Sequence, residues 1–227
     1  MENKISLKGT HLLCLLIMLY VVIMMISIAM VYKLVEIGPL TMASSSIVLP
    51  IWYVLGDIIA EVYGYKTSRV VIWSALLCEA IFIFSIVAMI HLPSPSFWHY
   101  QADFNVVFGK LPRVFLGSVT GIALGSFMNV YILTKWKALI HGKYFWLRSV
   151  GSCAIGEGIF TVVTIMFDYI GVFDMSKILQ MILISYSIKL SASIFLAGPA
   201  NFIVNLAKKH TGVDMYDYST NFNPFKL

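Results

Sequence analysis

Apolar residues form long runs that recur along the whole chain, with short polar stretches between them. A helix needs roughly 20 mostly apolar residues to cross a hydrocarbon core about 30 Å thick, and several runs reach that length. Strands of a membrane barrel would give shorter, alternating segments, so we expect an all-α fold. The pattern predicts one domain over residues 1–227, with six transmembrane helices at residues 12–32, 40–59, 70–90, 114–133, 149–169 and 178–206.

The composition agrees with a membrane protein. Of the 227 residues, 59% are apolar and only 12% are charged, and the mean hydropathy is +0.87. The longest predicted connection covers residues 92–113, and this leaves no room for a soluble catalytic domain.

The distribution of Lys and Arg predicts the orientation, because basic residues near the ends of spans favour the cytoplasmic side. With the N-terminus inside, eleven of them fall in cytoplasmic segments and four in outer loops. We therefore expect both termini in the cytoplasm. The net charge of +5 is then explained by topology and by contact with anionic membrane lipids, so we expect no nucleic-acid partner.

No motif indicates catalysis, a cofactor or a metal site. The sequence has no HExxH, GxSxG or P-loop motif, and its five histidines lie near predicted helix ends or in loops. Cys14, Cys78 and Cys153 fall inside predicted spans without CxxC spacing, so we interpret them as small apolar residues. We expect no enzyme activity and no cofactor, and any ATP hydrolysis must come from a partner protein.

Two carboxylates in the second span are candidate functional residues, because a charge in hydrocarbon is costly and normally faces a cavity or a partner. Asp57 and Glu61 lie one helical turn apart. They continue a stripe at helical spacing that contains Ser46, Pro50 and Tyr53. The alternative is a structural cluster with Lys66 and Arg69 that anchors the helix end at the membrane boundary.

Charged residues inside three other spans point to the same kind of cavity. Glu157 stands between Gly156 and Gly158, which leave space beside the carboxylate, and Lys189 lies near the middle of the last span. Structural pairing of Glu157 with Lys189 is the alternative. Glu79, in the third span, is a weaker candidate with the same alternative.

Further polar residues extend this candidate site. Tyr186 lies three residues before Lys189 and Ser193 four residues after it, so one helix face offers a phenol, a cation and a hydroxyl. Asn129 continues a stripe of small residues, Gly117, Gly121 and Gly125, that indicates close helix packing or a dimer interface. We leave open whether Asn129 contacts a ligand or a neighbouring helix.

The second span ends in the motif Asp57-Ile-Ile-Ala-Glu61-Val-Tyr-Gly64-Tyr-Lys66, followed by Arg69 and Trp73. This motif resembles the signature of the queuosine-precursor transporter family, also called vitamin-uptake-transporter-like. Gly156-Glu157 resembles the motif of the fifth span, and Tyr186 with Lys189 the polar face of the sixth. In that family an acid often follows one turn after the acid of the fifth span, where this chain has Ile159, Phe160 and Thr161.

The resemblance implies a multi-pass importer of 7-deazapurine precursors of the tRNA base queuosine in the bacterial inner membrane. It also implies a fold like that of energy-coupling-factor substrate-binding subunits. The alternative is a substrate-binding subunit of an ATP-driven vitamin or nucleobase uptake complex, with an ATPase partner.

The resemblance also suggests roles for the polar residues. A guanine-like ligand edge carries adjacent N–H and amino donors, which a carboxylate accepts side by side. We expect Glu157 to accept them, Lys189 to donate to the ring carbonyl, and Asn129 to bind a ring nitrogen. Candidates for stacking on the ring are Tyr53, Tyr186 and Phe160.

Three points stay open at this stage. The sequence does not distinguish 7-cyano- from 7-aminomethyl-7-deazaguanine. Proton uptake by Glu157 or Asp57, an ATPase partner and facilitated diffusion are all compatible energy sources. A homodimer is compatible with the glycine stripe.

Overall fold

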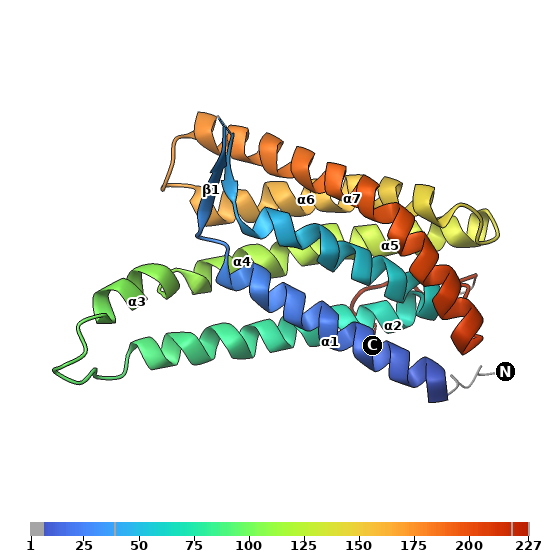
Figure 1. Cartoon of the computed structure of the whole chain (residues 1–227), viewed down its shortest axis with the longest axis horizontal. Coiled ribbons are helices and arrows are strands. Elements are labelled where there is room, and N and C mark those ends of the chain that lie inside the picture. The colour runs from blue at the N-terminus through green and yellow to red at the C-terminus, as the bar shows by residue number, and fades with distance from the viewer. Residues whose placement is uncertain (1–6, 39, 219, 227) are drawn as a thin grey trace.

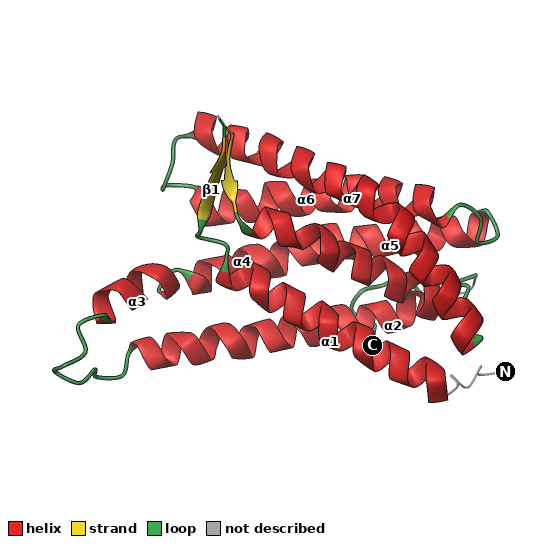
Figure 2. Cartoon of the chain, in the orientation of Figure 1, coloured by secondary structure: helices red, strands yellow, loops and turns green. Residues whose placement is uncertain are grey.

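The computed structural model describes residues 7–38, 40–218 and 220–226. Long helices form a bundle, with a small strand hairpin at one end (Figures 1 and 2). In chain order the elements are α1 (Leu7–Ala29), β1 (Leu34–Ile37), β2 (Leu40–Ala43), α2 (Ser45–Ile90), α3 (Gln101–Phe108), α4 (Leu111–Gly121), the π-helical segment η1 (Ile122–Ser126), α5 (Phe127–Leu139), α6 (Phe145–Tyr169) and α7 (Met175–Thr211).

Five helical stretches of the described residues are long and apolar enough to cross a membrane. They are Leu7–Ala29, Ser45–Ile90, Gln101–Leu139, Phe145–Tyr169 and Met175–Thr211. Their outer surface is apolar: Leu77, Ile81 and Phe84 on α2 are each more than half exposed, whereas Glu79 on the same helix is fully buried. A polar interior with an apolar exterior confirms an integral membrane helical bundle as the fold class.

Helix α2 is broken at Gly64. This glycine has φ 79° and ψ 176°, a conformation that side chains with a Cβ rarely adopt. A straight helix of 46 residues would be about 70 Å long, more than twice a hydrocarbon core. The chain instead reverses at the break (Figure 1), so that Ser45 and Glu79 line the same pocket. The turn therefore lies inside the predicted connection at residues 60–69, but helix continues on both sides of Gly64 and no loop of ten residues separates the two passes.

The C-terminal tail after α7 supplies partners for backbone groups beside this break. The N–H of Met215 donates to the Val62 carbonyl at 3.1 Å, and the N–H of Tyr65 donates to Asp217 Oδ2 at 2.8 Å. Farther along, Trp73 Nε1 donates to the Pro224 carbonyl. Buried backbone groups need such partners, so the tail stabilises the reversal of α2.

The hairpin corrects the expectation of helices alone. Strands β1 and β2 are antiparallel, with Leu34 opposite Ala43 and Val35 opposite Met42. The second predicted span therefore begins too early, because residues 40–43 are β2 and the helix starts at Ser45. Apolar residues fit a short hairpin and a helix equally well, so hydropathy does not separate the two.

The predicted fourth span is longer and less regular than expected. It runs from Leu111 to Leu139 and contains η1, a one-turn π-helical insertion. Its glycine stripe packs against α6: a Cβ on Gly125 would lie 2.6 Å from the Gly156 carbonyl oxygen, and one on Gly117 would lie 2.9 Å from Phe167 Cβ. The glycine stripe thus allows close packing of helices within the chain, which was one of the two interpretations of its sequence.

Candidate functional site

One face of α6 carries polar side chains along its whole length. Ser149, Cys153, Glu157 and Thr161 recur every four residues, and Asp168 follows two turns later. Residues at this spacing share a helix face, and all five are at most 3% exposed. This face, which we call the α6 polar stripe, therefore runs through the interior of the bundle.

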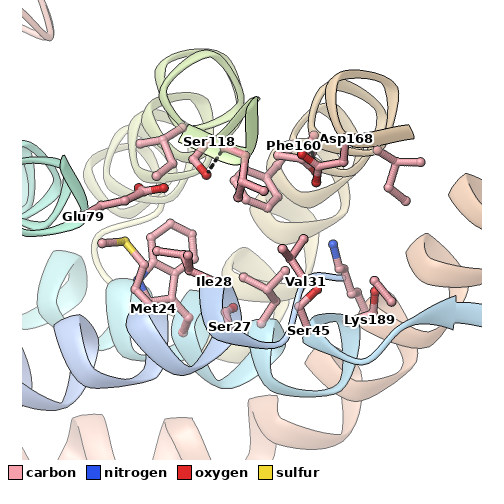
Figure 3. A pocket seen from close by; sticks show the side chains of 18 of the residues that line it. Met24, Ser27, Ile28, Val31, Ser45, Glu79, Ser118, Phe160, Asp168 and Lys189 are labelled. Carbon is pink, nitrogen blue, oxygen red and sulfur yellow. Dashed lines mark hydrogen bonds between the residues drawn. The ribbon is translucent and has the colours of Figure 1, made fainter. Parts of the chain in front are cut away.

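A pocket lies at the hairpin end of the stripe (Figure 3). Its lining comes from α1, β2, α2, α4, η1, α6 and α7, and it includes the aromatic rings of Trp52, Phe160 and Tyr169. We call it the hairpin-side pocket. Three charged side chains line it: Glu79 stands on one side, and Asp168 and Lys189 stand on the other.

The two carboxylates of this pocket have open acceptors. Glu79 is fully buried and Asp168 is 3% exposed. Three of their oxygens accept no hydrogen bond within the described part of the chain: both oxygens of Glu79, and Oδ1 of Asp168. The Ser118 hydroxyl lies near enough to Glu79 to stabilise its carboxylate, but the hydrogen bond with good geometry that it donates goes to the Val114 carbonyl at 2.9 Å. Buried acceptors without donors are costly, so this pocket is suited to a ligand that brings donors.

Glu157 and Lys189 lie next to this pocket. Lys189 Nζ donates to Thr161 Oγ1 at 3.0 Å and lies 5.4 Å from the centre of the Phe160 ring. Glu157 Oε1 accepts from Ser193 Oγ at 3.1 Å, and its Oε2 is a buried acceptor without a donor among the described residues. The two charges attract each other, yet the structure records no ion pair between them in this part of the chain.

Asp57 is fully buried farther along the stripe. Asn129 Nδ2 donates to its Oδ1 at 2.7 Å, and Ser149 Oγ and Cys153 Sγ donate to its Oδ2. Cys153 is therefore a hydrogen-bond donor to a carboxylate, which corrects its interpretation as a small apolar residue. Asn129 Oδ1 accepts nothing within the described ranges, and Asn129 lines a second small pocket together with Tyr53.

Glu61 lies at the opposite end of the bundle from the hairpin. Arg148 holds it with two hydrogen bonds of 2.7 and 3.1 Å, and Lys208 donates to it at 2.6 Å. Lys137 Nζ lies 3.8 Å from Glu61 Oε1 and donates to Asp214 in the tail at 2.6 Å. We call these five residues the Glu61 ion cluster. Glu61 pairs with these residues and not with Lys66 or Arg69, so its predicted boundary cluster has other members than expected.

Asp214 lies outside the helices, at the edge of this cluster. Burial alone would raise the pKa of its carboxyl group. Hydrogen bonds from Lys137 and Lys208, together with their positive charges, outweigh burial and hold the pKa below its usual value. The tail is thus attached to the cluster by a charged Asp214.

The structure distributes the predicted site residues over four places. Phe160 and Lys189 line the hairpin-side pocket, and Tyr53 and Asn129 line the second pocket. Asp57 and Glu157 lie on or against the α6 polar stripe without lining either pocket. Tyr186 is partly exposed and donates to the Ala154 carbonyl at 2.9 Å, so its hydroxyl joins α7 to α6. Their part in ligand binding stays a prediction.

Sequence reasoning missed Asp168 and Arg148. Asp168 lies at the end of the predicted span 149–169, and Arg148 lies just before it, among the basic residues of a predicted cytoplasmic segment. The spacing of polar residues along α6 was the available signal, because it places Asp168 on the same face as Glu157 and Thr161.

Comparison with known proteins gives the class. The sequence profile of the putative vitamin uptake transporter family matches residues 43–204, so the chain belongs to this family of transporters. A probable queuosine precursor transporter from Bacillus subtilis (strain 168) is 24% identical over 165 residues, which cover 72% of each chain. No solved structure matches the chain.

These matches confirm the resemblance seen in the sequence and the expectation that the protein is a transporter and not an enzyme. A multi-pass membrane protein with a small-molecule substrate agrees with both the matches and the apolar helices. The matches do not support the alternative of a subunit in an ATP-driven complex. Likeness to energy-coupling-factor subunits stays a prediction.

Proposed function

We propose that this protein imports a 7-deazaguanine precursor of queuosine, 7-cyano- or 7-aminomethyl-7-deazaguanine, across the bacterial inner membrane. The name of the Bacillus subtilis relative supports the substrate class. The observation that carries the proposal is the α6 polar stripe, which joins the hairpin-side pocket to the Glu61 ion cluster. Buried polar groups from end to end give a polar solute a path that lipid does not offer.

The topology proposed is six spans with both termini in the cytoplasm. The break at Gly64 supports it, because it turns one 46-residue helix into two antiparallel passes. The members of the Glu61 ion cluster support it too, since three basic side chains gather at the end of the bundle that this topology places inside. The hairpin-side pocket then lies toward the outer side.

Glu157 is the proposed acceptor for the donor edge of the ligand inside the path. Its Oε2 is open, and its Oε1 is held by Ser193. Two oxygens of one carboxylate match adjacent N–H and amino donors, and Lys189 is near enough to balance the charge. Phe160, one turn along α6, offers a ring face for stacking and already lies against Trp52, with ring centres 6.0 Å apart.

The Glu61 ion cluster is the proposed inner closure of the path. Its side chains come from α2, α5, α6, α7 and the tail, so release of a ligand into the cytoplasm requires these contacts to separate. An arrangement with an outward pocket and a closed inner end fits a protein that is ready to accept its substrate from outside.

Uptake by the purified chain in liposomes tests this function. Labelled 7-cyano-7-deazaguanine and 7-aminomethyl-7-deazaguanine are offered to liposomes that contain the protein alone, and guanine serves as the competing purine. We expect uptake of at least one deazaguanine and a loss of about tenfold or more in Glu157→Gln, because the amide has only one acceptor oxygen.

The matched control is Asp103→Asn, an exposed acid on α3, which should keep wild-type uptake. Absence of deazaguanine uptake and binding by the wild-type chain would contradict the proposed substrate. Full activity in Glu157→Gln would remove this residue from the site without removing the substrate.

A further inference from the structure

We propose that the hairpin-side pocket selects the cationic precursor, 7-aminomethyl-7-deazaguanine, over the neutral cyano compound. In this outer pocket Glu79 binds the ammonium group and Asp168 binds the donor edge of the ring, before the ligand moves along the path to Glu157. This inference rests on the proposed function. It adds a preference between the two substrates, and it assigns this preference to Glu79 and Asp168.

The charge balance of the pocket favours a cation. Two carboxylates and one ammonium line it, and the ammonium of Lys189 also balances Glu157 behind the pocket wall. Arg113 acts on Asp168 from the surface, where its guanidinium donates to the carbonyls of Phe167 and Ile170. No basic side chain is among the electrostatic neighbours of Glu79, so a positive ligand group would supply the charge partner that keeps this buried carboxylate ionised.

Glu79 is the more isolated of the two carboxylates. It is fully buried, neither oxygen accepts a hydrogen bond of good geometry from the described residues, and its electrostatic neighbours are Ser118 and Asp168, neither of which is basic. An alkylammonium group carries three donors and a full positive charge at neutral pH. It can satisfy both oxygens of Glu79, whereas a cyano group has no donor and would face the carboxylate with another acceptor.

Asp168 has surroundings that suit the ring edge instead. Its Oδ1 is a buried acceptor without a donor among the described residues, and Lys189 is among its electrostatic neighbours and lines the same pocket. An acceptor next to a donor matches the guanine-like edge, which presents N–H groups beside a carbonyl oxygen. Trp52 and Phe160 also line the pocket and offer ring faces for the heterocycle.

Calorimetric titration of the purified full-length protein in detergent tests the preference. We expect the aminomethyl compound to bind at least about tenfold more tightly than the cyano compound, since only it forms a charge-assisted contact with Glu79. Glu79→Gln should weaken the aminomethyl compound by about tenfold and change the affinity for the cyano compound little, which collapses the preference. Asp168→Asn should weaken both ligands, and the exposed control Asp103→Asn should weaken neither.

The outcomes separate this inference from the proposed function. If neither deazaguanine binds, the proposed substrate itself is wrong. Equal binding of both compounds, tighter binding of the cyano compound, or an unchanged preference in folded Glu79→Gln would overturn the inference and leave the function in place. The wild-type preference needs no variant, so it decides the matter even if Glu79→Gln does not fold.

Discussion

Arg148 donates hydrogen bonds of 2.7 and 3.1 Å to the two carboxylate oxygens of Glu61, a residue 87 positions earlier in the sequence. The arginine side chain is 1% exposed and the glutamate is fully buried. Arg148 Nε also donates to the Lys143 carbonyl, so the guanidinium holds the start of α6 as well as Glu61. This pair joins the two helices that carry most of the buried charges.

Replacement of Arg148 by methionine should destabilise the protein strongly. Removal of one partner from a buried ion pair leaves the other charge without compensation and typically costs about 3–5 kcal/mol. Lys208 still contacts Glu61, so we expect the lower end of that range. Thermal unfolding in detergent measures the change, with the exposed Lys66→Gln as control. An unchanged melting temperature in Arg148→Met would mean that Lys208 and Lys137 alone hold Glu61.

Gly125→Ala should separate α5 and η1 from α6. The added Cβ would lie 2.6 Å from the Gly156 carbonyl oxygen and 2.9 Å from Phe160 N, and backbone atoms cannot turn away as a side chain can. Overpacking of this kind costs about 1–3 kcal/mol.

Gly198→Ala on α7 is the matched control, because a Cβ there has nothing within 4 Å. Alanine in a helix is favoured over glycine by about 1 kcal/mol, so the control should keep or raise the melting temperature. Equal behaviour of the two variants would contradict the close packing at Gly125.

The sequence predicted the membrane bundle well because burial in lipid requires long apolar runs, and those are readable without an alignment. The interior acids Asp57, Glu79 and Glu157 were readable for the same reason, since each interrupts such a run. The exact helix boundaries could not be predicted, because the sequence on both sides of Gly64 is helical and the chain reverses only through the positive φ of this glycine.

The partners of the buried charges could not be predicted from spacing. Glu61 has Lys66 and Arg69 nearby in sequence, but a helix break directs it toward Arg148 and Lys208 on other helices. Arg69 instead donates to the Asn223 carbonyl in the tail. Such choices depend on how helices far apart in sequence pack, which one sequence does not contain.

The stability of the folded chain should depend on pH through Asp214. Its pKa is held below the usual value by Lys137 and Lys208, so its charged form stabilises the fold at pH values above the unfolded pKa of about 3.9. This contribution is lost as the pH falls through the lower, folded pKa. In melting curves recorded from pH 7 to pH 3, the melting temperature of the wild type should be higher than that of Asp214→Asn at neutral pH. The difference between the two melting temperatures should shrink below about pH 4.

The control for this titration is Asp103→Asn, whose melting curve should follow that of the wild type at every pH. Asp103 is exposed and lies on α3, at the other end of the molecule (Figure 1). A constant difference between the wild type and Asp214→Asn down to pH 3 would show that this carboxyl group does not titrate with folding.

Labelling of single cysteines should establish the orientation of the bundle. Cys14 and Cys78 are exposed on the helix surface and can be replaced by alanine, whereas Cys153 is better replaced by serine, which keeps a donor for Asp57. Into this background Asp103→Cys places a thiol at the hairpin end, and Lys66→Cys places one at the Gly64 end. With both termini inside, a membrane-impermeant maleimide added to spheroplasts should label the first variant and spare the second until the membrane is permeabilised. The reverse pattern would place the hairpin-side pocket toward the cytoplasm, and the proposed direction of substrate entry would then be wrong.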